Sequence, residues 1–241
     1  MTAIPIPMHR IPSEPSASDP CITLAGATLA VHVSGAAYWP EQGLLAVADL
    51  HLEKGSSYAA RGVLLPPYDT AVTLARLNEL IAHFAPRVVV ALGDSFHDGR
   101  GPARLGAADR ATLQTMQRGR DWIWIAGNHD PDPADNIGGR FLDVLKVGPL
   151  TFRHEPTGAV GEVAGHLHPV ARVSGRGRTV SRRCFATDGV RMVMPALGAY
   201  TGGLNVRDRA FARVFETLTF QAHMLGQTRL YAVAAGRCQP D

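Results

Sequence analysis

The sequence has little cysteine and no long hydrophobic run. Three scattered cysteines, Cys21, Cys184 and Cys238, argue against a disulfide framework or a cysteine zinc site, and they favour a reducing, cytoplasmic setting. No apolar run reaches the roughly 18 residues that a membrane-spanning helix needs. The first 20 residues contain no continuous apolar stretch of the kind found in a signal peptide. The sequence therefore predicts a cytoplasmic protein without a membrane partner.

Lysine is also scarce, and the overall charge is small. Lys54 and Lys146 are the only lysines, and the 24 basic residues exceed the 21 acidic residues by a net charge of +3. This balance does not by itself indicate a nucleic-acid-binding protein. Arginine is the better bidentate partner for phosphate, although an arginine bias equally fits a GC-rich coding sequence.

The remaining composition is that of an ordinary globular protein. The 241 residues are 46% hydrophobic and 19% charged, which excludes a collagen, a coiled coil and a mostly disordered chain. Residues 1–20 are rich in proline and serine and are expected to form a flexible tail. Residues 21–241 show no repeat and no break in composition, so we expect one domain with a sizeable core.

Five apolar, strand-like runs each end in Asp, Asn or His. A helix is predicted over Asp69–Phe84, between the first two runs, because its leucines recur at helical spacing. This order favours a layered α/β or α+β fold, in which ligands gather beyond the carboxyl ends of the strands. More strand is expected over residues 170–233. The five runs and the residues that follow them are Leu44–Ala48 before Asp49 and His51, Val88–Leu92 before Asp94, Trp122–Ala126 before Asn128, Leu150–Arg153 before His154, and Val163-Ala164 before His166 and His168.

The side chains after these runs are all oxygen or imidazole donors. Such a set suits Mn, Fe or Zn better than Mg or Ca. Seven donors are too many for one tetrahedral zinc, but they suit two ions that share a carboxylate and act on an in-line displacement at phosphorus. Residues i and i+2 of an extended segment point the same way, so the Asp-x-His and His-x-His pairs are expected to present two donors together. The candidate ligands are Asp49, His51, Asp94, Asn128, His154, His166 and His168.

These motifs resemble those of the metallophosphoesterase (calcineurin-like phosphoesterase) superfamily. The resemblance rests on Asp49-x-His51, Gly93-Asp94, Gly127-Asn128-His129-Asp130, His154 and Gly165-His166-x-His168. It implies a four-layer α/β/β/α sandwich with two divalent ions. It also implies that Asp94 bridges the ions, that Asn128 contacts metal and phosphate, and that His129 acts on the leaving oxygen. By position, Asp49, His51 and His168 would hold the first ion, and Asn128, His154 and His166 would hold the second.

One segment departs from the phosphatases of this superfamily. Many of them read GDxxDRG, whereas here His97 replaces the Asp and Asp98 replaces the Arg. A carboxylate there is expected to repel a doubly charged monoester more than a singly charged diester. The GDxFH pattern resembles the nuclease branch, in which the extra histidine lies beside the scissile phosphate. His97 is therefore a candidate catalytic residue or a hydrogen-bonding neighbour, and Asp98 or Asp130 is expected to orient His129.

A second resemblance is to the bacterial ligase-associated phosphoesterases of the PdeM type. It rests on DLHLEKG (49–55), Arg61-Gly62, Pro66-Pro67, GDSFHD (93–98) and residues 194–203. It implies a manganese-dependent phosphodiesterase and DNA endonuclease, associated with a DNA ligase and a helicase in a DNA-damage response. Zinc and iron are the alternative metals.

Basic residues near these motifs are candidates for contact with DNA. Lys54 and Arg61 follow the first metal motif. The sequence predicts a hairpin over Arg172–Arg183, with Arg176 and Arg178 near its turn. This hairpin forms either a phosphate-binding ridge or a solvated hairpin whose charges block edge pairing.

Two other functions share the same ligands. A small-molecule phosphodiesterase or pyrophosphatase, acting on cyclic nucleotides or nucleotide sugars, would use every one of them. A binding scaffold that has lost its chemistry is disfavoured, because degenerate members of the superfamily usually lack some ligands.

Overall fold

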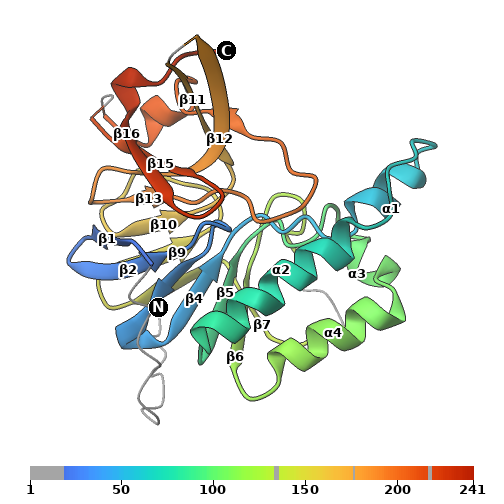
Figure 1. Cartoon of the computed structure of the whole chain (residues 1–241). Coiled ribbons are helices and arrows are strands. Elements are labelled where there is room, and N and C mark those ends of the chain that lie inside the picture. Colours follow the sequence, from blue (N-terminus) through green and yellow to red (C-terminus); the bar gives the residue numbers. More distant parts are fainter. Residues whose placement is uncertain (1–18, 133–135, 176, 217–218) are drawn as a thin grey trace.

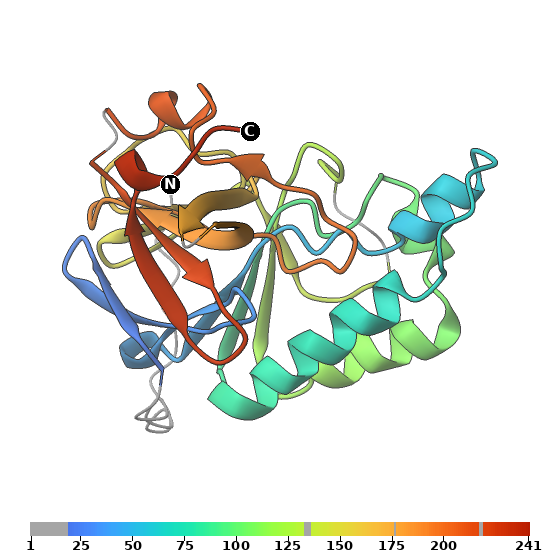
Figure 2. The same ribbon diagram turned by 45° about the horizontal axis from the view of Figure 1, so that its top comes forward.

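Two β-sheets pack face to face, and helices cover the outer face of one of them (Figure 1, Figure 2). The computed structural model describes residues 19–132, 136–175, 177–216 and 219–241. Most of the predicted tail, residues 1–18, lies outside the described residues. The mixed α/β fold expected from the sequence is confirmed.

The first sheet combines an antiparallel and a parallel half. Strands β1 to β4 pair antiparallel, whereas β4 to β7 are parallel, so the carboxyl ends of the parallel strands lie at one edge. Its seven strands follow in chain order. They are β1 (Cys21–Leu24), β2 (Ala27–Val31), β3 (Ala37–Trp39), β4 (Leu44–Val47), β5 (Val88–Leu92), β6 (Asp121–Ile125) and β7 (Arg140–Leu142), with a 3₁₀ turn η1 (Pro40–Gln42) before β4.

Two longer helices cover the outer face of this sheet (Figure 2). Helix α2 (Asp69–Phe84) has the bounds that the sequence predicts, and α4 (Ala107–Gln117) was not predicted. Two shorter helices, α1 (Lys54–Ala59) and α3 (Gly101–Arg104), lie after β4 and β5 near the carboxyl edge. Among the described residues, none of the helices has the combination of length and apolarity that crossing a lipid bilayer requires.

Strand β5 shows how the sequence builds two core layers at once. All five of its residues are buried. Val88, Val90 and Leu92 pack between the two sheets, whereas Val89 and Ala91 pack under the helices. Because successive side chains of a strand point to opposite faces, a strand covered on both faces becomes a continuous apolar run.

The second sheet supplies the other two motif-bearing strands. Strands β9 and β10 are parallel neighbours, so the residues that follow them lie side by side. The order is β14-β11-β12-β13-β10-β9-β8, with a hairpin of β15 and β16 paired to β12. The bounds are β8 (Val144–Val147), β9 (Leu150–Arg153), β10 (Glu162–Ala164), β11 (Pro169–Gly175), β12 (Arg178–Thr187), β13 (Met192–Val193), β14 (Leu204–Asn205), β15 (Gln221–Leu225) and β16 (Leu230–Ala234).

The outer layer over the second sheet consists of short turns and loops. In the part of the chain that the structure describes, this layer contains the 3₁₀ turns η2 (Phe211–Arg213) and η3 (Ala235–Arg237) and no α-helix. Its apolar side chains, Phe211, Phe215 and Phe220 among them, pack on strands β11, β12 and β15. Stacked aromatic rings therefore cover this face of the sandwich.

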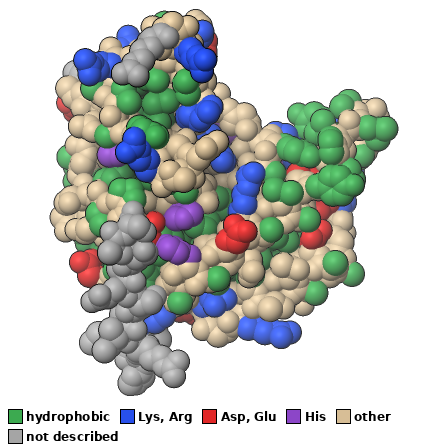
Figure 3. All heavy atoms as spheres, viewed as in Figure 1, with side chains coloured by type: hydrophobic (Ala, Val, Ile, Leu, Met, Phe, Trp, Pro, Cys, Tyr) green, Lys and Arg blue, Asp and Glu red, His purple; other side chains and the backbone are tan. Residues whose placement is uncertain are grey.

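Helix α1 and the residues after it project from the body of the molecule as an arm (Figure 1, Figure 2). The base of the arm is held where the Asp69 carboxylate accepts a 2.9 Å hydrogen bond from the Gly55 amide. Its tip carries the exposed side chains of Val63, Leu64 and Tyr68, and hydrophobic side chains gather there in Figure 3. The arm therefore exposes apolar surface next to the edge that carries the motifs.

Removing a buried leucine of α2 tests this packing. Leu77 is fully buried between α2 and the first sheet. Leu77→Ala is expected to lower the free energy of unfolding by about 2–5 kcal/mol, because it leaves a cavity. The matched change Leu64→Ala, at a side chain that is 87% exposed, is expected to change it by less than about 0.5 kcal/mol. Equal urea-unfolding midpoints for the two variants would contradict the packing of α2.

Candidate metal centre

The polar residues predicted from five separate strands meet at one edge of the molecule. This edge is where the carboxyl ends of β4, β5 and β6 in the first sheet approach those of β9 and β10 in the second. Residues far apart in the chain touch there: His51 lies beside His168 and Asn128 lies beside His166. The structure brings together all seven candidate ligands.

Turns, rather than extended strands, aim most of these side chains. Asp49, His51, Asp94, His166 and His168 all have left-handed backbone, with φ between 43° and 69°. Non-glycine residues rarely adopt this conformation, and it costs free energy. The expectation that the Asp-x-His and His-x-His segments are extended is therefore wrong. Side chains two residues apart on an extended strand point the same way, so a strand could not direct them to different parts of the site. A left-handed turn after the strand can.

Backbone hydrogen bonds between the loops hold this strained conformation. The amide of His51 donates to the carbonyl oxygen of Asp94 at 2.9 Å, and the amide of His97 donates to the carbonyl oxygen of Leu52 at 2.9 Å. The loops after β4 and β5 thus pair with each other just beyond the strands. Each loop fixes the other, so the position of Asp94 depends on both.

Two motif glycines are needed because another motif presses against them. A Cβ added at Gly127 would lie 2.1 Å from the Asp94 amide nitrogen, and one added at Gly93 would lie 2.4 Å from the ring of His154. Gly93 also has a positive φ of 72°. These close approaches leave no room for a side chain and explain why glycine precedes Asp94 and Asn128.

The first group of donors contains Asp49, His51 and His168. Each offers one ligand atom, and the three atoms lie within 4.8 Å of one another. The Nε2 atoms of His51 and His168 are 3.4 Å apart, and Asp49 Oδ1 lies 3.3 Å from His168 Nε2. Asp49 is completely buried, so its charge faces the imidazoles rather than solvent.

The second group contains Asp94, His154 and His166, with Asn128 beside them. Asn128 Oδ1 lies 2.8 Å from His154 Nε2 and 3.0 Å from His166 Nδ1. Asp94 Oδ1 lies 3.4 Å from His154 Nε2. Its other oxygen, Oδ2, faces the first group at 3.9 Å from His51 Nε2. One carboxylate therefore faces both groups.

Backbone carbonyls orient the imidazoles from behind. His154 Nδ1–H donates to the Leu92 carbonyl at 2.9 Å, and His168 Nδ1–H donates to the Gly202 carbonyl at 3.2 Å. A proton on Nδ1 leaves the Nε2 lone pair of each ring directed into the centre. Such partners commonly fix the tautomer of metal-binding histidines.

The electrostatics of the site favour neutral imidazole in two of the donors. Burial, with a contribution from the neighbouring His168, lowers the pKa of His51 to about 2. Burial also lowers the pKa of His166, with His154 contributing. Burial acts in the same direction on His168, but the hydrogen bond and charge of Asp49 outweigh it and raise its pKa. Neutral imidazole is the form that binds a metal ion.

The residues present fit two divalent ions. The two groups offer imidazole nitrogens, carboxylate oxygens and one amide oxygen, a donor set that suits Mn, Fe or Zn. Because Asp94 faces both groups, one carboxylate can serve two ions. The centre could therefore hold the two ions that the sequence predicts.

His129 and His97 lie next to the first group. His129 Nε2 is 4.0 Å from Asp94 Oδ2, and His129 Nδ1–H donates to the His97 carbonyl oxygen at 2.8 Å. The rings of His97 and His129 stack at 5.2 Å, and His97 Nδ1 lies 3.4 Å from His51 Nδ1. Burial lowers the pKa of His97 to about 4, with Lys54 and His129 adding to the effect.

Neither of the acids expected to orient His129 does so. Both oxygens of Asp98 accept hydrogen bonds from Arg104 at 2.9 Å. Although burial raises the pKa of Asp98, the hydrogen bonds from Arg104 and Ser57 outweigh it and hold the pKa below its usual range. Asp130 Oδ2 accepts from the Phe96 amide at 3.0 Å, and burial raises its pKa to about 7. The backbone carbonyl of His97 orients His129 instead.

The candidate substrate-binding residues lie at different distances from the centre. The Lys54 ammonium donates to the Tyr200 carbonyl at 2.9 Å, and Arg61 lines a pocket beside Asp98. Arg178 pairs with Gly175 at the tip of the β11–β12 hairpin, roughly 20 Å along the strand from His168 at about 3.3 Å per residue. Arg176 lies outside the described residues.

The rest of the expected basic ridge is only partly exposed. Arg182 is exposed, whereas Arg183 is half-buried and donates to the Ala196 carbonyl. Arg183 is therefore partly engaged in supporting the loop that carries Gly202.

Several neighbours of the centre were not predicted from the sequence. The Tyr58 ring lies 5.6 Å from the His97 ring, and Arg104 neutralises Asp98. The carbonyls of Leu92 and Gly202 leave no signal in a sequence, because every residue has one. Arg104 lies only six residues after Asp98, so a nearby basic residue was the one signal for this pair in the sequence.

A separate group of donors lies at the other end of α2. Asp19, His32 and His83 lie within reach of one another, roughly 20 Å from the start of α2 at 1.5 Å per residue. His83 Nε2 lies 2.7 Å from Asp19 Oδ2, which we interpret as a structural hydrogen bond between the last turn of α2 and the segment that leads into β1. It plays no part in the centre described above.

One substitution tests the close contact between the motif loops. Gly127→Ala is expected to lower the free energy of unfolding by about 1–3 kcal/mol, because its methyl group would overlap the Asp94 amide. Gly236→Ala is the matched control, since nothing lies within 4 Å of the added Cβ there. Thermal unfolding of both variants measures the difference. Equal melting temperatures would mean that the loop after β6 does not press on Asp94.

Comparison with known proteins agrees with this geometry. The family model of calcineurin-like phosphoesterases matches residues 44–190, which is more than half of the chain. The crystal structure of the nuclease MPE from Pseudomonas putida has a TM-score of 0.68 at 27% identity, over 89% of this chain and 100% of that chain.

A second solved structure is more distant. Yfce, a phosphoesterase from E. coli, is 16% identical over 80% of this chain and 98% of that chain, with a TM-score of 0.38. No curated protein matches this chain. The residues matched by the family model include both donor groups. The chain therefore belongs to the calcineurin-like phosphoesterase family and is a metal-dependent phosphoesterase.

Proposed function

We propose that this phosphoesterase is a phosphodiesterase whose substrate is DNA and whose cofactor is a pair of divalent ions, with manganese preferred. The observation that carries the proposal is the position of Asp94, whose two oxygens face different groups of donors. The likeness to a nuclease over the whole of that chain supports phosphodiesters as the substrate class.

The chain's own residues have separable tasks in this reaction. When bound, two divalent ions supply an activated nucleophile and stabilise the charge that develops at phosphorus. Asp49, His51 and His168 would hold one ion, and Asn128, His154 and His166 the other, with Asp94 between them. Asn128 directs its oxygen to the histidines, which leaves its exposed amide nitrogen to donate to a phosphate oxygen.

His129 is the residue that we assign to the leaving oxygen. Its Nδ1 proton is held by the His97 carbonyl, so Nε2 is the atom that can exchange a proton with substrate. Its side chain is 39% exposed, whereas the donor residue Asp94 beneath it is buried. A histidine in this position can protonate the departing oxygen as a general acid.

The charge of Asp98 does not by itself disfavour a monoester. The Asp98 carboxylate does not act as a free negative charge, because Arg104 pairs with both of its oxygens. Preference for a diester is therefore supported by the absence of an Arg at position 98, where the phosphatase motif has one, and by the nuclease relative. A small-molecule diester remains the competing substrate.

The proposed role in DNA repair, with a DNA ligase and a helicase as partners, rests on the PdeM-type motifs. The exposed apolar tip of the α1 arm offers a surface of the kind that protein partners cover. A scaffold without chemistry is disfavoured, because the described residues retain both complete groups of donors.

Metal-stripped protein separates these functions. With Mn, Zn, Fe or Mg restored singly, we expect turnover of bis-p-nitrophenyl phosphate that depends on metal and exceeds that of p-nitrophenyl phosphate, with Mn the most effective. Preferential monoester turnover would make the protein a phosphatase. Lack of turnover with every metal would favour the scaffold. Competition by single-stranded DNA against the chromogenic diester then distinguishes DNA from a small-molecule substrate.

Replacing His129 tests its assignment as the general acid. His129→Asn is expected to lower kcat on single-stranded DNA by about 100-fold or more, as for loss of a general acid. The loss should be smaller on bis-p-nitrophenyl phosphate, because p-nitrophenolate leaves without a proton. His223→Asn on β15 is the matched control. Metal content, measured by elemental analysis, should stay unchanged; wild-type DNA cleavage by His129→Asn would disprove the role.

A further inference from the structure

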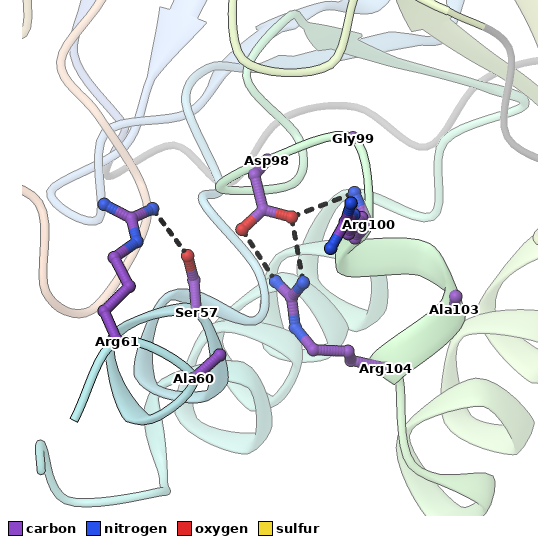
Figure 4. A pocket seen from close by; sticks show the side chains of 8 residues that line it. All are labelled: Ser57, Ala60, Arg61, Asp98, Gly99, Arg100, Ala103 and Arg104. Atoms are coloured by element: carbon purple, nitrogen blue, oxygen red, sulfur yellow. Dashed lines mark hydrogen bonds and ion pairs between the residues drawn. The ribbon is translucent and has the colours of Figure 1, made fainter. Parts of the chain in front are cut away.

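A pocket of about 720 Å³ lies beside the metal centre, between α1 and α3. Figure 4 shows its lining, with Arg61 on the α1 side, Arg100 and Arg104 on the α3 side and Asp98 between them. The lining residues are Ser57, Ala60, Arg61, Asp98, Gly99, Arg100, Ala103 and Arg104. None of them is a donor of the centre, so the pocket is a separate site.

The pocket carries an excess of positive charge. Asp98, its only carboxylate, is fully engaged by the guanidinium of Arg104 in a bidentate pair (Figure 4). Arg61 has a neutral partner, the Ser57 hydroxyl at 2.9 Å. The Arg100 guanidinium has no hydrogen-bond or ion-pair partner among the described residues. Two exposed guanidinium groups therefore remain available to an anion, and guanidinium matches phosphate geometry.

Aromatic side chains connect the pocket to the centre. The His97 ring lies between the His129 ring at 5.2 Å and the Tyr58 ring at 5.6 Å. The Arg61 guanidinium lies 5.7 Å from the centroid of the Tyr58 ring. The sequence of groups from the centre outward is thus His129, His97, Tyr58 and Arg61. A row of rings that ends in a cation can accommodate a single strand, whose bases stack on rings and whose phosphates pair with cations.

We infer that the pocket binds a phosphate of a polynucleotide strand, further along the strand from the phosphate in the metal centre. Arg61 and Arg100 hold this second phosphate, and Tyr58 lies beside the stretch of strand between the two phosphates. The inference rests on the proposed phosphodiesterase function and extends it to substrate choice. A small diester has one phosphate and gains nothing from the pocket, whereas a polynucleotide gains a second charged contact.

The double variant Arg61→Ala/Arg100→Ala tests the pocket against a matched pair of arginines. Arg118→Ala/Arg140→Ala removes the same charge from exposed residues at the opposite edge of the sheet, where β6 and β7 begin. The probes are a single-stranded oligodeoxynucleotide and bis-p-nitrophenyl phosphate, each with manganese restored. Oligonucleotide binding is also measured by fluorescence anisotropy in chelator at several salt concentrations.

The pocket variant is expected to lose about tenfold more kcat/KM on the oligonucleotide than on the chromogenic diester. Its binding should weaken, and the slope of log K against log salt should become shallower by roughly 0.7, the value for one phosphate contact on a single strand. The control variant should show neither change. Equal losses on the two substrates, or oligonucleotide binding and cleavage equal to the control, would overturn the inference.

The same data separate this inference from the proposed function. If the wild-type protein turns over neither substrate, the phosphodiesterase function fails, and the anisotropy arm still decides whether the pocket binds a strand. If the wild-type protein hydrolyses the chromogenic diester but neither binds nor cleaves the oligonucleotide, the diesterase function stands and the pocket inference is wrong.

Discussion

The Asp94 carboxylate lies between two groups of histidines, and the rest of the site is arranged around it. Its Oδ1 faces His154 and its Oδ2 faces His51, while Oδ1 also accepts the His129 amide at 2.9 Å. A buried carboxylate is costly unless it is paired and hydrogen-bonded. Divalent ions in both groups would satisfy this charge, which links the fold of the loops to the metal chemistry of the family.

Holding Asp94 in place requires strained loops. Asp49, His51, Asp94, His166 and His168 all have positive φ, and glycine is required where the loops cross at Gly93 and Gly127. The hydrogen bonds between the loops after β4 and β5, together with the packed sheets beneath them, offset this strain. Strain gathered at one edge, above a well-packed core, is typical of a site where ligand position matters more than local stability.

The proposed catalytic residues and the proposed substrate-binding residues belong to different elements of the fold. The donors and His129 lie in loops between the sheets, whereas Arg61, Arg100 and Tyr58 belong to the small helices α1 and α3 and their flanking residues. His97 joins the two regions: its carbonyl orients His129 and its ring lies beside Tyr58. Changes in the arm can therefore alter which diester is bound without moving the ions' ligands.

The sequence alone determined the features that depend on short stretches of chain. Apolar runs defined β5 and β9 and the leucine spacing defined α2, each with the observed bounds, and the residues after the strands pointed to the seven candidate donors that the structure brings together. Tertiary structure decided the rest. The left-handed turns that aim the donors, the carbonyls of Leu92 and Gly202 behind the imidazoles, and the partners of Asp94 in both groups of donors all depend on segments distant in the sequence. A local sequence pattern determines which residues form a strand or can bind a metal ion. The partner of a carboxylate is determined by the loop that packs against it.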